Sequence, residues 1–272
     1  MAHTRTLRFG FLLVGVMVAG LIPVRQSHAI DVGSVVGMWL FDEGDGDAVT
    51  DSSGNGNDGK IFGEHAAAVP VWVDGKYGTA LEFDGKSGHV MFNRAEEPED
   101  AFILNLDTDA TVMFWVDVVP PPGFAILWSR GDGADTGRFN ISQHADGFVG
   151  FDYRNDQGKL FRLIWGFALP SEDWNHIVIT RKGTAYRQYV NGVDQGEEAN
   201  DPEPDLPSAL QWMISGRTGF IFNGRIDELA VFDTVLSEAE INQIMSQGLV
   251  EVVLAVSPAG KLTTAWGSFK DR

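Results

Sequence analysis

The sequence contains no cysteine, and only 20 of its 272 residues are basic against 38 that are acidic. The absence of cysteine excludes disulfide bonds, thiolate zinc sites and cysteine nucleophiles. The net charge of −18 disfavours binding to nucleic acid or to an anionic membrane surface, because both present negative charge that the chain repels. Divalent cations and neutral ligands remain compatible with this charge.

Long apolar runs are also lacking, with one exception at the N-terminus. Two arginines precede an apolar run over residues 9–22, and Ser27-His28-Ala29 places small residues three and one positions before a cleavage point. The run ends at Pro23 after about 14 residues, short of the roughly 20 that span a bilayer. We therefore predict a signal peptide over residues 1–29, cleaved after Ala29. The mature chain should have no membrane span and should be secreted or held at the cell surface, in an extracellular or periplasmic location.

The rest of the chain is dominated by short runs of β-branched and aromatic residues bounded by Gly, Asp, Asn or Pro, which is typical of strands. Runs such as 112–116 and 177–179 are apolar on both faces, which indicates strands covered on both sides. Asn191-Gly192 suits a type I′ hairpin turn and predicts antiparallel neighbours. The predicted strands are Val36–Phe41, Thr79–Phe83, His89–Phe92, Thr111–Asp117, Phe124–Ser129, Arg138–Gln143, Phe148–Tyr153, Leu160–Trp165, Trp174–Arg181, Tyr186–Val190, Leu210–Ile214 and Arg225–Phe232.

One helix is predicted after these strands. Ser237 and Glu240 have the spacing of a capping box, an apolar stripe follows at Ile241 and Ile244, and Gly248 ends the pattern. One short helix after a dozen strands argues against alternating strands and helices. We expect an all-β fold with this helix packed on its side.

Six blocks within residues 36–247 carry a resemblance to a known family. They are Trp39–Gly44, Asp51–Gly59, Gly78–Gly85, Trp174–Val178, Tyr189–Gly192 and Gly224–Phe232. In this order they resemble a laminin-G-like jelly-roll domain of the concanavalin A-like lectin/glucanase superfamily. The resemblance implies a two-sheet antiparallel jelly-roll sandwich with one short C-terminal helix, over residues 30–248. It does not choose among the glycan-binding modules, adhesion proteins and hydrolase accessory domains of that superfamily.

The segment 42–58 concentrates Asp, Glu and Asn in a glycine-rich loop, and these oxygen ligands are the type that calcium prefers. A polar surface loop with Asx turns is the simpler interpretation from composition. Strand alternation predicts that Asp227 shares a face with Leu229 and Val231, where an unpaired carboxylate is costly. Arg225, on the same face, could supply its partner.

The resemblance implies a different partner, a structural Ca²⁺ between the first loop and an aspartate of the last strand. Asp51, Asn57 and Asp227 match those motif positions best. The resemblance implies side-chain ligation by Asp51 and Asp227, with Asn57 contributing its amide oxygen or its backbone. Such an ion would couple metal binding to stability. Zinc is not expected, because the histidines of the mature chain lack a short ligand spacing, and His176 is interpreted as a structural residue within an apolar strand.

Catalytic motifs are absent from the sequence. The Glu-x-Asp-x-x-Glu pattern of the superfamily's β-glucanases does not occur, and proline interrupts the carboxylate pairs Glu97/Glu99 and Glu203/Asp205. We therefore expect a non-catalytic recognition module that binds a glycan or an extracellular or surface protein. The alternative is a carbohydrate-active enzyme, a glycoside hydrolase, or an accessory module of one.

The sequence assigns no ligand-binding residues. Tryptophans 39, 115, 174 and 212 fall within strands and are expected in the core. The hairpin around 155–158 places Asp152 and Arg154 on one face with Arg162 of the partner strand, where they could bind a sugar or a carboxylate. A solvated strand face explains the hairpin equally well. Residues 249–272 depart from the family pattern and are interpreted as a C-terminal tail or an added edge strand.

Overall fold

The computed structural model describes residues 30–63, 69–92, 109–119, 123–130, 138–145, 148–154, 160–169, 174–196, 199–200, 212–216 and 220–254. The predicted signal peptide at 1–29, the carboxylate pairs at 97–99 and 203–205, and residues 255–272 lie outside this description. In the described part of the chain, no helix has both the length and the apolar character needed to cross a bilayer.

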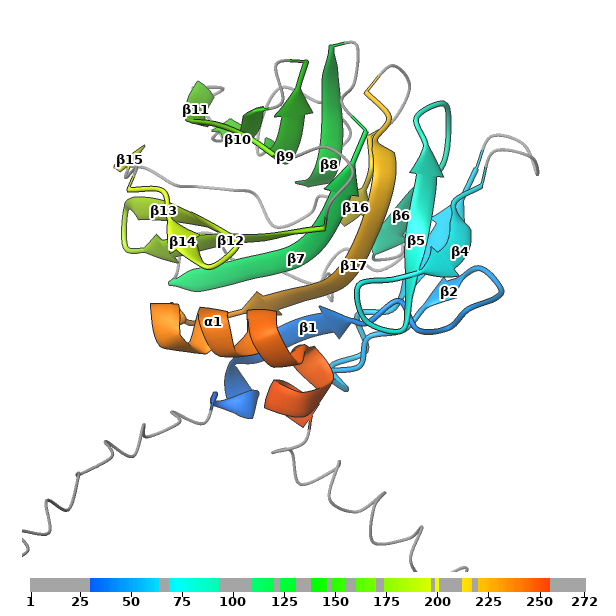
Figure 1. The fold of residues 1–272 in the computed structure, drawn as a ribbon, viewed down its shortest axis with the longest axis horizontal. Coiled ribbons are helices and arrows are strands. Elements are labelled where there is room, and N and C mark those ends of the chain that lie inside the picture. The colour runs from blue at the N-terminus through cyan, green and yellow to red at the C-terminus, as the bar shows by residue number, and fades with distance from the viewer. Residues whose placement is uncertain are drawn as a thin grey trace, which may run out of the picture.

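The strands form two antiparallel sheets packed face to face (Figure 1), which confirms the predicted two-sheet sandwich. Sheet A has the order β14 (Val193–Asp194), β13 (Ala185–Val190), β12 (Asn175–Lys182), β7 (Ala110–Val118), β17 (Asn223–Phe232), β5 (Thr79–Asp84) and β4 (Val71–Asp74), while β1 (Val35–Trp39) pairs with β17 and β15 (Ala199–Asn200) with β13. Sheet B has the order β11 (Leu160–Ala168), β10 (Phe148–Arg154), β9 (Arg138–His144), β8 (Phe124–Arg130), β16 (Trp212–Ile214), β6 (His89–Phe92), β3 (Gly59–Phe62) and β2 (Ala48–Val49).

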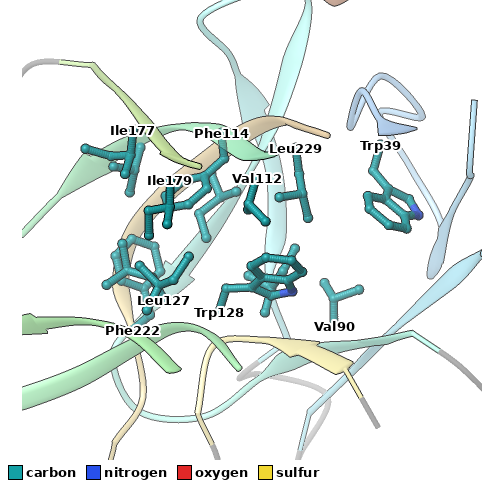
Figure 2. Packing of buried hydrophobic residues seen from close by; sticks show 14 of the residues in the cluster. Trp39, Val90, Val112, Phe114, Leu127, Trp128, Ile177, Ile179, Phe222 and Leu229 are labelled. Carbon is teal, nitrogen blue, oxygen red and sulfur yellow. The ribbon is translucent and has the colours of Figure 1, made fainter. Parts of the chain in front are cut away.

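The main core fills the space between the sheets (Figure 2), where alternate residues of each strand point inward. Trp128 and Trp212 stack there with ring centroids 4.8 Å apart, and Trp39 lies 4.6 Å from Phe92. Trp39 and Trp212 are thus core residues as predicted. Burial of these large rings supplies much of the apolar area that holds the two sheets together.

A third layer covers the outer face of sheet A. Helix α1 (Glu238–Gln247) lies on the side of sheet A away from β8–β11 (Figure 1). It begins with the predicted capping box, in which the Ser237 hydroxyl accepts the Glu240 N–H and the Glu240 carboxylate accepts the Ser237 N–H. Ile241 and Ile244 are buried against apolar residues of sheet A, among them Met38, Met113, Val178, Ala230 and Phe232.

The segment after α1 differs from the predicted edge strand. Val250–Leu254 forms a π-helical turn, η2. Its Val252 and Val253, with the preceding Leu249, join the apolar cluster on the outer face of sheet A, as does Ile30. The valine-rich composition favours a strand locally, but burial of Val252 and Val253 on the sheet side of a short turn, with Val250 and Glu251 exposed, overrides that preference. The added edge strand is therefore wrong for residues 250–254.

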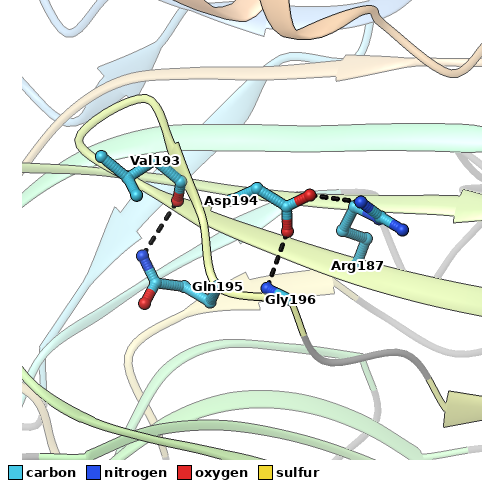
Figure 3. Close-up of polar contacts among 5 residues, drawn as sticks. All are labelled: Arg187, Val193, Asp194, Gln195 and Gly196. Carbon is cyan, nitrogen blue, oxygen red and sulfur yellow. Dashed lines mark hydrogen bonds and ion pairs between the residues drawn. The ribbon is translucent and has the colours of Figure 1, made fainter.

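Side chains protect the free edge of sheet A (Figure 3). Asp194 of β14 pairs with Arg187 of β13 and also accepts the Gly196 N–H at 2.8 Å. The Gln195 Nε2 donates to the Val193 carbonyl at 2.9 Å. These contacts hold β14 and the two residues that follow it against β13.

Candidate functional site

A buried carboxylate, that of Asp51, stabilises the loop over residues 42–58. Asp51 is 6% exposed, and its Oδ1 accepts the backbone N–H groups of Met38 at 3.0 Å and Ser53 at 2.9 Å. Its Oδ2 accepts the Asn57 N–H at 2.9 Å. The Asn57 amide donates to the Val36 carbonyl at 2.8 Å, so the loop is fastened to β1. Asp51 and Asn57 therefore lie side by side, and each is held in place by hydrogen bonds within the loop and to β1.

Asp227 lies on the opposite side of β17 from the one that strand alternation predicts. The pairing of β17 with β7 shifts register between Asp227 and Ala230, and Glu228 has a left-handed backbone with φ of 46°. This β-bulge adds one residue, so Leu229 faces the core while Asp227 faces the outer side of sheet A. The predicted shared face with Leu229 and Val231 is wrong. Arg225 is not its partner either, because Arg225 pairs with Asp117.

Two buried acids at the bulge hold neighbouring segments to sheet A. The Asp227 Oδ2 accepts the Tyr77 N–H at 2.9 Å, whereas its Oδ1 is buried without a hydrogen-bond partner. The Glu228 carboxylate accepts the Leu249 N–H at 3.0 Å. Burial raises the pKa of Asp227 to about 8 and that of Glu228 to about 7. The acids thus connect the β4–β5 turn and the start of η2 to β17.

A row of buried polar side chains continues from Asp227 across sheet A. Asp227 pairs with Trp115 of β7, which pairs with His176 of β12, and the two rings lie 5.0 Å apart. The Lys76 Nζ lies 4.4 Å from the Trp115 ring. The Trp115 Nε1 and His176 Nδ1 are buried without hydrogen-bond partners. Burial, reinforced by the Lys76 charge, lowers the pKa of His176 to about 3, so His176 is a neutral structural histidine.

These residues meet the requirements of a calcium site only in part. Asp227 has an unpartnered oxygen that a cation would satisfy. Asp51 already accepts three N–H groups, and the Asn57 carbonyl accepts the Trp39 indole N–H at 2.9 Å. Within the described ranges, no three Asp, Glu, His or Cys side chains gather as a metal site. Calcium held jointly by Asp51, Asn57 and Asp227 stays a prediction.

A second polar cluster lies on the outer face of sheet B, around the predicted β10–β11 hairpin. The two strands pair as expected, with Asp152 opposite Arg162. Asp152 is only 3% exposed, and its Oδ1 accepts the Asn140 Nδ2–H at 3.3 Å. A solvated strand face is therefore wrong for Asp152. The turn at 155–158 and the side chains of Arg154 and Arg162 lie outside the description.

Two serines extend this cluster. Ser129 pairs with Asn140 across the strands, Ser142 lies two residues further on the same face, and each serine is 1% exposed. Neither hydroxyl has a hydrogen-bond partner. We call Ser129, Asn140, Ser142 and Asp152 the polar row. Ser129, Asn140 and Ser142 were not predicted as site residues, although polar residues on both sides of Ile141 indicate a strand whose outward face is polar. Buried hydroxyls without partners each lower stability by about 1–3 kcal/mol.

Aromatic side chains border the polar row. Phe124 pairs with His144 on β8 and β9, and their ring centroids lie 5.2 Å apart. Phe220 packs edge-on against Phe124 at 5.6 Å and is 49% exposed. We call Phe124, His144 and Phe220 the aromatic rim. Hydrogen-bonding groups beside a partly exposed ring surface suit a ligand with both hydroxyl groups and apolar faces.

A family model matches the part of the chain that contains the polar row and the aromatic rim. Residues 84–242, more than half of the chain, match a family model described as the concanavalin A-like lectin/glucanases superfamily. No curated protein sequence matches the chain significantly.

Solved structures share the fold at low sequence identity. One is Domain 4 of AbnA, a GH43 extracellular arabinanase from Geobacillus stearothermophilus, in complex with arabinotriose, with 19% identity, a TM-score of 0.62, and coverage of 78% of this chain and 98% of that domain. The binding domain of botulinum neurotoxin DC in complex with rat synaptotagmin II has 15% identity and a TM-score of 0.61, over 79% of this chain and 52% of that one. Trypanosoma rangeli sialidase in complex with sialic acid has 15% identity and a TM-score of 0.57, over 78% and 33%.

Proposed function

Because the chain belongs to the concanavalin A-like lectin/glucanases superfamily, we propose that it is a recognition domain that binds a neutral glycan through the polar row and the aromatic rim. The observation that carries the proposal is the pair of buried, unpartnered hydroxyls of Ser129 and Ser142 beside the Asn140–Asp152 hydrogen bond. Sugar hydroxyls can complete such hydrogen bonds once the buried row opens to a ligand, and the C–H faces of a sugar can pack on the exposed ring of Phe220.

The comparisons and the charge support this ligand class. The arabinotriose-bound arabinanase domain matches over nearly its whole length, so a domain of this size and fold can bind an oligosaccharide by itself. The net charge of −18 disfavours anionic ligands. A neutral glycan therefore fits the chain better than an acidic one.

Binding without turnover is the second part of the proposal. Glycoside hydrolysis uses a pair of carboxyl groups about 5–9.5 Å apart. The polar row and the aromatic rim together contain one carboxylate, that of Asp152, and it is engaged with Asn140. The alternative is a glycan-cleaving enzyme, and release of reducing sugar from any bound glycan would contradict the non-catalytic proposal.

The predicted signal peptide makes the proposed domain an exported one. Cleavage after Ala29 would start the mature chain at Ile30, which is 3% exposed in the apolar cluster on sheet A. We expect N-terminal sequencing of material collected outside the cytoplasm to begin at Ile30. Full-length protein retained inside the cell would contradict export.

The decisive experiment measures glycan binding by a pair of serine variants. Neutral oligosaccharides are screened on an array, and the best one is titrated by calorimetry against wild type, Ser129→Ala and Ser142→Ala. We expect each variant to lose about twofold to tenfold in affinity, because a hydrogen bond to the ligand is worth about 0.5–1.5 kcal/mol. Their melting temperatures should stay equal or rise, because each variant removes a buried hydroxyl that has no partner in the free domain.

Thr111→Val is the matched control. The Thr111 hydroxyl donates to the Thr234 carbonyl at 2.7 Å and accepts the Leu236 N–H at 3.0 Å. The control should lower the melting temperature and leave glycan affinity unchanged. If wild type binds no neutral glycan but captures a surface protein independently of glycans, the proposed ligand class is wrong.

We also propose the structural calcium that the family resemblance implies at Asp51, Asn57 and Asp227. Support comes from the unpartnered Oδ1 of buried Asp227. We expect a higher melting temperature in millimolar calcium than in excess chelator, and loss of that difference in Asp227→Asn. Equal melting temperatures for wild type in the two conditions would contradict a bound ion.

A further inference from the structure

We propose that ordered water is bound between the two sheets, where it connects the buried side-chain amides of Gln143 and Gln188. These glutamines lie on β9 and β13, one on each sheet. The site lies on the inner side of β9, whereas the polar row lies on its outer side. The inference therefore does not depend on the proposed function.

Both glutamines point into the main core. Gln143 lies two residues after Ile141 on β9. Gln188 lies between Tyr186 and Val190 on β13, two residues from each. All three neighbours belong to the core cluster between the sheets, and alternate residues of a strand share a face. Gln143 and Gln188 are only 1% and 0% exposed, so each strand carries a primary amide into the core.

Neither amide is satisfied by the protein. The Nε2 and Oε1 atoms of both side chains are buried and have no hydrogen-bond partner. A primary amide offers two N–H donors and a carbonyl acceptor, and burial of such groups without partners is costly. Native proteins satisfy buried groups of this kind with ordered water. The two glutamines therefore mark a place where the folded chain retains water.

The strand register brings the two glutamines to the same part of the core. The rings of Phe151 on β10 and Tyr186 on β13 lie 5.1 Å apart across the sandwich. Val149, two residues before Phe151, pairs with Gln143. Gln188 lies two residues after Tyr186. The start of β10 and the end of β13 lie at the same end of the sandwich, because the short connection from β11 to β12 joins the sheets there. Gln188 thus faces the strand pair that carries Gln143.

The direct cross-strand neighbours of the amides cannot supply the missing hydrogen bonds. Gln188 pairs with Ile179 on β12. Gln143 pairs with Val149 on β10 and with Ala125 on β8. All three neighbours are apolar and buried. Because a retained water needs about two to four polar partners, it must bond to both amides at once.

Removal of one amide and removal of both should have opposite effects. The test compares wild type with Gln143→Leu, Gln188→Leu and the double variant by urea unfolding, because leucine is similar in volume to glutamine and has no polar atom. Each single variant leaves the water with too few partners, so it should lower the urea midpoint. The double variant displaces the water and should have a higher midpoint than either single variant.

Additive changes of either sign would overturn the inference. Midpoints that rise in both single variants and rise further in the double variant would show that the amides are buried without water. Losses that add in the double variant would show that the two amides share no ligand.

Nuclear Overhauser spectra of isotope-labelled wild type identify the ligand directly, and they do not depend on whether the variants fold. We expect cross-peaks between the side-chain amide protons of both glutamines and slowly exchanging, bound water. Cross-peaks between the two amides, with none to bound water, would show that they bond to each other and that the proposed water is wrong.

Gln195→Leu is the matched control. Gln195 is partly exposed, and its Nε2 already donates to the Val193 carbonyl at 2.9 Å. Combined with Gln188→Leu, this variant should change the urea midpoint additively, because the two amides share no partner. The amide protons of Gln195 should show no cross-peak to bound water.

Discussion

At the scale of single residues, Asp51 is expected to stabilise the first loop through its hydrogen bonds. It accepts three backbone N–H groups from inside a buried position. Replacement of Asp51 by Ala leaves these donors without a partner and should lower the free energy of unfolding by about 3 kcal/mol, since hydrogen bonds to charged groups are worth about 1.5–3 kcal/mol each and do not add fully. Urea unfolding measures the change.

Excess chelator separates this role from metal binding. The loss for Asp51→Ala should be the same with chelator and with calcium if the N–H groups account for it. Asp45→Ala, an exposed aspartate in the same loop, should change the free energy of unfolding by less than about 0.5 kcal/mol. A loss that appears only in calcium would show instead that Asp51 acts mainly through an ion.

His176 should lower the free energy of unfolding as the pH falls below about 6.5. Its pKa is lowered to about 3 in the folded chain by burial and by Lys76, against about 6.5 when unfolded. Above pH 6.5 neither state binds the proton. As the pH falls from 6.5 toward 3, the unfolded chain takes it up first, so the free energy of unfolding falls by about 1.4 kcal/mol per pH unit from this group.

The variant His176→Gln isolates that contribution. Unfolding by urea at several pH values between 7 and 4.5 gives the slope for each protein. Other groups titrate in both, so the variant should show a slope smaller by about 1.4 kcal/mol per pH unit below pH 6. Equal slopes would mean that His176 is protonated in the folded domain.

The local sequence was sufficient to predict the capping box and the burial of Trp39 and Trp212, but not the polar row. The capping box depends on Ser237 and Glu240 alone, so the local sequence contains all of the information. The burial of Asp152 depends on what covers the outer face of sheet B, and no local pattern encodes that. The partly exposed Trp174, with the Arg225 guanidinium 5.0 Å from its ring, likewise departs from the expected core position because its environment is tertiary.

At the scale of elements, the sequence predicted the positions of strands and hairpin turns better than it predicted which face of the sheet each side chain occupies. Long runs such as β7 and β12 and the Asn191-Gly192 turn were predicted. The bulge at Glu228 was not, because a left-handed glutamate has no sequence signature. One extra residue reverses the faces beyond it, and this moved Asp227 to the outer side of sheet A.

The turn between β13 and β14 should tolerate no side chain at Gly192. Gly192 has a φ of 76°, and an added Cβ would lie 2.1 Å from the Asn242 Oδ1 of α1. Gly192→Ala therefore combines backbone strain with a clash between the hairpin and the helix, and should lower stability by about 2–3 kcal/mol. Thermal unfolding followed by circular dichroism measures it.

Gly183→Ala is the matched control for backbone strain. Gly183 has a φ of 57° and open space where a Cβ would lie, so only the strain of about 1 kcal/mol should appear. The difference between the two variants reports the contact between the hairpin and α1. Equal losses would mean that Asn242 moves away without cost.

At the scale of the whole molecule, the layers determine which surface is left for a ligand. Sheet A has the main core on one face, and on the other α1, η2 and the buried row of Asp227, Trp115 and His176. The outer face of sheet B carries the buried polar row and, beside it, the partly exposed aromatic rim. The ligand face is therefore sought on sheet B, opposite the layer that stabilises the fold.

Residues 249–254, which pack on the outer face of sheet A, should be needed for the domain to fold stably. A chain ending at Gly248 loses the buried side chains of Leu249, Val252 and Val253, and it leaves the Glu228 carboxylate without the Leu249 N–H. Burial of three aliphatic side chains contributes roughly 5 kcal/mol, a large part of the stability of a typical domain. Truncation after Gly248 should therefore unfold the domain or lower its urea midpoint steeply, whereas truncation after Leu254 retains these contacts and serves as the control. If both truncated chains unfold at the midpoint of the full chain, η2 contributes nothing to the fold; if both lose stability equally, the contribution comes from residues beyond 254.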